Sequence, residues 1–142
     1  MRKSDHFNAY LKNEKEHKKI LQDIFITIGR NDKNIMQFRY LDVNGYEKIR
    51  LDRDKIGNEI KLISDDKLQN KATRYYFNDS KSKELEKVWF SNLDLNIERG
   101  KVETPYKPTL RAMLPIKNNG KFDGVIIINY FMKDALTKLV KT

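Results

Sequence analysis

Residues 88–96 read VWFSNLDLN, and this stretch decides which fold the chain can adopt. If it is a strand, its side chains alternate between two faces. One face is mostly apolar and holds Trp89, Ser91, Leu93 and Leu95. The other begins apolar and then turns polar, with Val88, Phe90, Asn92, Asp94 and Asn96. Such a strand belongs in a sheet whose first face packs on the core and whose second face meets solvent, a loop or a ligand.

The neighbouring segments predict further antiparallel strands. Residues 35–42 and 46–53 flank Asn44-Gly45, a dipeptide that readily forms a two-residue hairpin turn. In the second of these strands, alternation places Glu47 on the same face as Ile49 and Leu51. Two more strands are expected over 109–116 and 125–131. The second of them has apolar residues at both odd and even positions, which is typical of a central strand with both faces covered.

Three other segments have helical patterns. Apolar residues recur at helical spacing across residues 4–28, apart from the polar stretch KNEKEHKK at 12–19. A second helical segment is expected over 66–78, broken at 78–82, and a short helix over 132–142 ends the chain. The order of helix, hairpin, helical segment and three strands indicates an α+β domain.

The composition limits the possible functions. The chain has 142 residues, of which 39% are hydrophobic, and this suits one folded domain with its own core. Its net charge of +9 comes from acids and bases that are interleaved, as on an ordinary solvated surface. There is no cysteine and no apolar stretch of membrane-spanning length, and His6 and His17 lack one-turn spacing. No metal site, cofactor or catalytic residue is therefore expected, and the domain is not expected to be an enzyme.

Several motifs occur in a fixed order along most of the chain. They are QFRYLD at 37–42 with Gly45, RYYF at 74–77, LDLN at 93–96 with Glu98 and Gly100, the segment Pro105–Arg111, and GVI at 124–126 with Asn129-Tyr130. In this order, from about Ile20 to Phe131, they resemble the Cache or PDC sensor domains. These are PAS-like extracytoplasmic modules of bacterial histidine kinases, diguanylate cyclases and chemoreceptors.

The resemblance implies a long amino-terminal helix packed on a five-stranded antiparallel sheet, with a short carboxy-terminal helix. Residues 1–142 would be a single sensor domain: 1–30 the long helix, 35–131 the sheet and pocket, and 132–142 a helix leading to a transmembrane segment. The parent protein would be anchored in the inner membrane of a bacterium, with this domain on the periplasmic side. The implied function is to bind a small molecule, for which a carboxylate is one candidate, and to transmit that signal through the helices. No nucleic-acid partner is implied.

The implied pocket lies on the sheet face away from the long helix, beneath the segment between the second and third strands. There, Arg74 stands beside Tyr75 and Tyr76, and together they offer a charge and hydroxyl groups to a small carboxylate. Arg111 stands alone among apolar neighbours and needs a partner, either an internal carboxylate such as Asp94 or an anionic ligand. The predicted ligand-binding residues are Arg74, Tyr75, Tyr76, Asp94, Arg111, Asn129 and Tyr130.

Two other functions remain open from the sequence. A nucleic-acid binder would use Phe38, Tyr40 and Tyr46 as a stacking platform beside Lys48 and Arg50. An interaction module would use the same fold with a pocket that takes no ligand. Binding experiments with single-stranded nucleic acid and with small molecules would distinguish these alternatives.

The amino-terminal helix also suggests a homodimer. Phe7, Tyr10 and Leu11 are apolar residues of this helix that need cover, and a second copy of the helix is one way to provide it.

Overall fold

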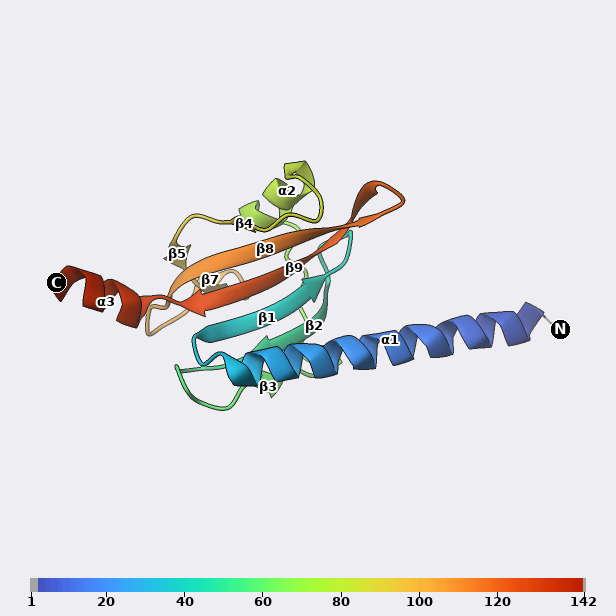
Figure 1. Ribbon diagram of the computed structural model, residues 1–142, viewed down its shortest axis with the longest axis horizontal. Coiled ribbons are helices and arrows are strands. Elements are labelled where there is room, and N and C mark those ends of the chain that lie inside the picture. Colours follow the sequence, from blue (N-terminus) through green and yellow to red (C-terminus); the bar gives the residue numbers. More distant parts are fainter. Residues whose placement is uncertain (1–2, 142) are drawn as a thin grey trace.

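An antiparallel sheet forms the centre of the molecule, and the long helix α1 lies along one side of it (Figure 1). The computed structural model describes the backbone of residues 3–141 and the side chains of residues 13–140. The helices are α1 (Lys3–Asn31), α2 (Tyr75–Ser82) and α3 (Lys133–Lys141), with a 3-10 turn η1 (Asp65–Lys67). The strands are β1 (Ile35–Leu41), β2 (Glu47–Asp52), β3 (Lys61–Leu62), β4 (Trp89–Phe90), β5 (Asp94–Leu95), β6 (Ile97–Glu98), β7 (Lys101–Val102), β8 (Pro108–Asn118) and β9 (Lys121–Phe131).

The strand order confirms the predicted α+β fold. The main sheet runs β3-β2-β1-β9-β8-β4, and β5 pairs with β8 beyond β4. Because β4 and β5 occupy the same edge, the sheet has five main positions, with the two-residue β3 added outside β2. The predicted hairpin joins β1 and β2, and Gly45 in its turn has a φ of 84°. β9 is the central strand, as its apolar run predicts.

Each face of the sheet carries its own core. On the α1 face, Phe25 stacks on Phe38 with ring centroids 4.0 Å apart, and Ile49 and Leu51 join them. On the opposite face, Tyr76 and Phe77 of α2 pack in a second buried cluster: Leu41, Met113, Val125 and Ile127. The amino-terminal part of α1 extends beyond the sheet (Figure 1). None of the helices within residues 3–141 combines the length and the apolar character that a membrane crossing requires.

The packing of Phe38 excludes the stacking platform considered for nucleic acid. Phe38 is buried beneath α1, so a base cannot reach its ring. Arg50 is also buried, where it is paired with Glu47 and Asp52. Of the proposed aromatic residues, Tyr46 is the exposed one. The predicted stacking platform of Phe38, Tyr40 and Tyr46 beside Arg50 is therefore wrong.

The edge strand over residues 88–96 contains a bulge that the alternation did not predict. Trp89 pairs with Met113, but Asp94 pairs with Thr109, so this strand advances five positions while β8 advances four. One extra residue turns every later side chain to the other face. Leu95 is consequently 38% exposed, contrary to the predicted apolar face, and Asp94 points toward the α2 face.

The second helix also differs from the prediction of residues 66–78. Residues 69–71 run beside the β1–β2 turn, where Glu47 N donates to Gln69 O at 2.9 Å and Lys71 N donates to Gly45 O at 2.8 Å. These contacts hold the segment extended, so α2 begins only at Tyr75. It continues through the expected break, and Ser80 donates its hydroxyl to the carbonyl of Tyr76 within α2.

Candidate ligand-binding site

A cluster of buried charges lies between α2 and the sheet. Its two deepest cations are Arg39 of β1 and Arg111 of β8, each only 1% exposed. Both side chains point to the face of the sheet that holds the second core. Each arginine therefore brings a guanidinium into that buried layer. Buried charges require partners, and the surrounding residues provide them.

Arg111 is held by Asp94, the internal carboxylate that was one of its two predicted kinds of partner. Arg111 Nη1 lies 2.6 Å from Asp94 Oδ1. The other carboxylate oxygen accepts a hydrogen bond from the Tyr75 hydroxyl at 2.7 Å and lies 4.0 Å from Arg74 Nη2. The bulge makes this arrangement possible, because it turns Asp94 to the face of Arg111.

Arg39 is held from three sides. Its Nη1 donates to the Tyr76 hydroxyl at 3.1 Å and to Glu47 Oε2 at 3.4 Å, and its Nη2 donates to Asn129 Oδ1 at 2.9 Å. Asn129 in turn donates to Gln37 Oε1 at 3.0 Å. These bonds connect β1, β2, β9 and α2 through one guanidinium.

Tyr76 lies at the centre of the cluster. The guanidinium carbons of Arg111, Arg74 and Arg39 lie 4.5, 5.3 and 5.5 Å from its ring centroid. Burial acts to raise the pKa of Tyr76, but the nearby charges of Arg39 and Arg111 outweigh it and leave the pKa below its usual value. The region is therefore electropositive, which favours an anion.

A second network adjoins this cluster and is centred on Glu98. Its carboxylate is approached by five side chains: Gln37 at 2.7 Å, Arg50 at 2.9 Å, Asn96 at 3.1 Å, Gln69 at 3.2 Å and Lys71 at 3.8 Å. Burial acts to raise the pKa of Glu98, but Arg50 and Lys71 lower it to about 2. Glu98 belongs to the small hairpin of β6 and β7, so this network fastens that hairpin to the main sheet.

The structure brings together six of the seven predicted residues. They are Arg74, Tyr75, Tyr76, Asp94, Arg111 and Asn129. Tyr130 instead packs against the core of the α1 face. Successive residues of a strand point to opposite faces, so Asn129 and Tyr130 could not both reach one pocket.

Sequence reasoning missed Arg39, Glu47 and Glu98. The signal for Arg39 is the same as for Arg111, namely one charged residue inside an apolar strand. Strand alternation predicts Glu47 on the same face as Ile49. In the structure, a second bulge shifts the register between Tyr40 and Leu41, so Glu47 pairs with Leu41 and lies on the other face. That shift turns the carboxylate toward Arg39. Within the described residues, no group of three or more histidine, aspartate or glutamate side chains is placed to hold a metal ion.

Comparisons with solved structures show the same fold. A domain assigned to a sensory box/GGDEF family protein from Vibrio parahaemolyticus aligns with a TM-score of 0.78 and 28% identity, over 94% of this chain and 49% of that one. The extracellular domain assigned to a histidine kinase aligns equally well, with a TM-score of 0.78 and 28% identity, over 94% of this chain and 47% of that one. The chain therefore spans about half the length of these two structures.

A more distant structure shares the fold alone. The sensory domain of the Campylobacter jejuni chemoreceptor Tlp3, with isoleucine bound, has a TM-score of 0.64 and 12% identity, over 91% of this chain and 46% of that one. The comparison with curated proteins found no match. A family model described as the sensor domain of bacterial histidine kinases matches residues 1–139. With its PDC fold and this match over nearly the whole length, the chain belongs to the family of bacterial histidine kinase sensor domains.

Proposed function

We propose that residues 1–142 form one extracytoplasmic sensor module of a membrane-anchored signalling protein, and that this module binds a small carboxylate between α2 and the sheet. The observation that carries the proposal is the pair of buried guanidinium groups of Arg39 and Arg111, which flank Tyr76. The Nε atom of each is buried without a hydrogen-bond acceptor among the described residues. Buried donors in proteins are nearly always bonded, and a carboxylate can accept from such donors.

The balance of charge around Tyr76 supports an anionic ligand. Arg39, Arg74 and Arg111 surround its ring, and the carboxylates paired with them are Glu47 and Asp94. Glu47 is also shared with Arg50, so it neutralises Arg39 only in part. A monoanion would complete this balance.

Arg74 is the arginine best placed to meet an incoming ligand. It stands at the amino-terminal end of α2, and its one ion pair with a described residue, Asp94, is 4.0 Å long. Its side chain remains 19% exposed, whereas that of Arg111 is nearly buried. A ligand entering beneath α2 would displace the ring of Tyr76. Its carboxylate would then pair with Arg74 in place of the weak contact between Arg74 and Asp94.

Strand alternation gives a route from this site to α1. Arg39 points toward the site, while its neighbours Phe38 and Tyr40 belong to the core beneath α1. A shift of β1 on ligand binding would therefore move the surface on which α1 rests. Such a shift changes the signalling state only if the ligand binds one arrangement more tightly than the other.

The similar structures support the location and the class of ligand. The extracellular assignment of one neighbour agrees with an extracytoplasmic module, and the isoleucine bound to the chemoreceptor domain is a carboxylate-bearing molecule. The relatives are about twice as long as this chain, in agreement with one module of a longer protein.

A thermal-shift screen with small carboxylates, amino acids and amines tests the proposal. A carboxylate at about 100 times its dissociation constant should stabilise the chain by about 2.7 kcal/mol. Arg74→Ala should remove most of this stabilisation, because it takes away the least committed cation of the site. Arg30→Ala is the matched control, since Arg30 is an exposed arginine at the end of α1.

Two results would contradict this proposal in different ways. Stabilisation that survives Arg74→Ala would show that the ligand binds elsewhere, while the sensor function would stand. If no compound stabilises the chain, the module takes none of these ligands, and the interaction-module alternative is favoured.

We also propose a homodimer through α1. Ile20, Ile24 and Ile28 form an apolar stripe on this helix, with 55%, 46% and 42% of their surface exposed. They lie one turn apart on the same flank, and a second α1 would bury them. The sequence-based candidates Phe7, Tyr10 and Leu11 lie outside the residues whose side chains are described.

Cysteine crosslinking tests this dimer, because residues 1–142 contain no cysteine of their own. Ile24→Cys in the membrane-anchored parent protein should give a disulfide-linked dimer under mild oxidation. Lys19→Cys, also exposed but about 140° around the helix, should give little. Equal crosslinking of both variants, or none, would refute the interface.

A further inference from the structure

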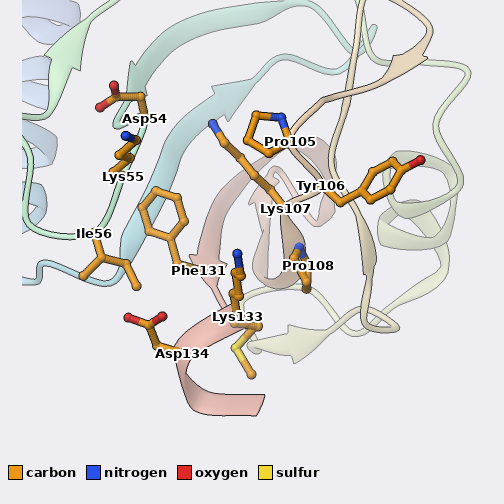
Figure 2. Close-up of a pocket in the computed structure, with 11 residues that line it drawn as sticks. Asp54, Lys55, Ile56, Pro105, Tyr106, Lys107, Pro108, Phe131, Lys133 and Asp134 are labelled. Atoms are coloured by element: carbon orange, nitrogen blue, oxygen red, sulfur yellow. The ribbon is translucent and has the colours of Figure 1, made fainter. Parts of the chain in front are cut away.

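A separate pocket lies where β9 leaves the sheet and α3 begins, and Figure 2 shows the residues that line it. Its volume is about 370 Å³, which is within the range of small-molecule sites. It is formed by three segments: residues 54–56 after β2, residues 105–108 leading into β8, and residues 131–134 at the β9–α3 junction. None of these residues belongs to the cluster around Tyr76.

The walls of this pocket are largely apolar. Ile56, Phe131 and Pro108 come from the three different segments and border the same space (Figure 2). All three are partly buried, so their remaining exposed surface faces a concave site. An apolar group of a ligand would be stabilised here because it removes apolar surface from water.

The rim of the pocket carries charges of both signs. Three lysines line it, and Lys107 is paired with Glu103 at 2.8 Å. Lys55 and Lys133 have no ion-pair partner among the described residues. Two aspartates, Asp54 and Asp134, also line the pocket, and Asp54 accepts a hydrogen bond from the neutral amide of Asn58 at 3.0 Å. Two unpaired ammonium groups beside an apolar wall suit a ligand with an apolar body and one carboxylate.

We propose that this pocket binds a small apolar monocarboxylate, whose carboxylate lies between Lys55 and Lys133 and whose apolar part rests on Phe131. The backbone links the pocket to the start of the exit helix. Met132 N donates to Pro108 O at 3.2 Å, and Leu136 N donates to Met132 O at 2.9 Å in the first turn of α3. A ligand here would join residues 105–108 to the β9–α3 junction and fix the direction in which α3 leaves the domain. This site acts independently of the one beneath α2.

Two-dimensional NMR of the ¹⁵N-labelled chain tests the proposal, with benzoate and isovalerate as probes. Benzylamine is the cationic counterpart of benzoate, and inorganic phosphate tests for attraction by charge alone. We expect saturable shifts at the amides of Ile56, Lys107 and Lys133 with the carboxylates. Benzylamine and phosphate should leave these amides unshifted.

Charge reversal at the rim should weaken this binding. Lys133→Glu and, independently, Lys55→Glu should each raise the dissociation constant by about tenfold. Lys121→Glu is the matched control, because it makes the same charge change on an exposed residue at the far end of β9 and should alter affinity less than twofold. The proposal is overturned if the carboxylates shift only residues near Tyr76, if benzylamine shifts the pocket equally, or if Lys121→Glu weakens binding as much as Lys133→Glu.

Discussion

Replacing Glu47 with glutamine is expected to lower the free energy of unfolding by about 3–5 kcal/mol. The Glu47 side chain is fully buried and lies between two buried arginines, at 3.4 Å from Arg39 and 3.2 Å from Arg50. It also accepts the backbone N–H of Gln69 at 2.9 Å. An amide in this position keeps the shape of the side chain but leaves the charge of Arg39 without an adjacent carboxylate.

Urea denaturation followed by the fluorescence of Trp89 measures this loss. Glu84→Gln is the matched control, because Glu84 is 69% exposed and its pair with Lys87 is a surface pair. Its removal should change the stability by less than about 0.5 kcal/mol. A loss below about 1 kcal/mol for Glu47→Gln would mean that Arg39 finds sufficient compensation from Tyr76 and Asn129.

Glu47 also illustrates which parts of the fold could be predicted from the sequence. The hairpin, the long helix and the central strand follow from local signals: a turn dipeptide, helical spacing and an apolar run. The faces of two strands could not be predicted, because each contains a bulge that depends on its partner strand. One bulge moved Glu47 to the site face, and the other moved Asp94 there.

The candidate site, like the fold, could be predicted only in part from the sequence. The need of Arg111 for a partner follows from the cost of burying an unpaired charge, but its pairing with Asp94 depends on the bulge that turns Asp94 to the same face. Glu98 lies in the two-residue strand β6 and carries no comparable signal, because its partners come from four separate segments of the chain. Only the folded chain brings those partners together.

Glu98→Gln should have the second-largest effect, and it should depend on pH. The pKa of Glu98 falls from 4.5 to about 2 in the folded chain. A carboxylate with a lowered pKa contributes its stability fully above pH 4.5 and loses it as the pH falls toward 2. This lowering of the pKa corresponds to a contribution of about 2–3 kcal/mol to the free energy of unfolding at neutral pH. This value is below the full conversion of the pKa shift because the Glu98 side chain is 22% exposed and solvent screens its charge in part.

The measurement is the free energy of unfolding of the natural chain and of Glu98→Gln, each followed from pH 7 down to the acid limit of folding. The difference between the two should be about 2–3 kcal/mol near neutrality and should shrink steadily below pH 4.5. Asp52 contributes with the opposite sign, because burial raises its pKa; the charge of Glu98 raises this pKa further, so Glu98→Gln should also lower the pKa of Asp52. Glu59→Gln, an exposed control, should give a difference near zero throughout. When Glu98 is neutralised, Arg50 keeps Glu47 and Asp52, and the buried Lys71 loses a carboxylate at 3.8 Å but keeps its hydrogen bond to Gln69 at 3.0 Å, so the loss should stay below that of Glu47→Gln. A difference that does not vary with pH would show that Glu98 stabilises the fold by packing and not by its charge.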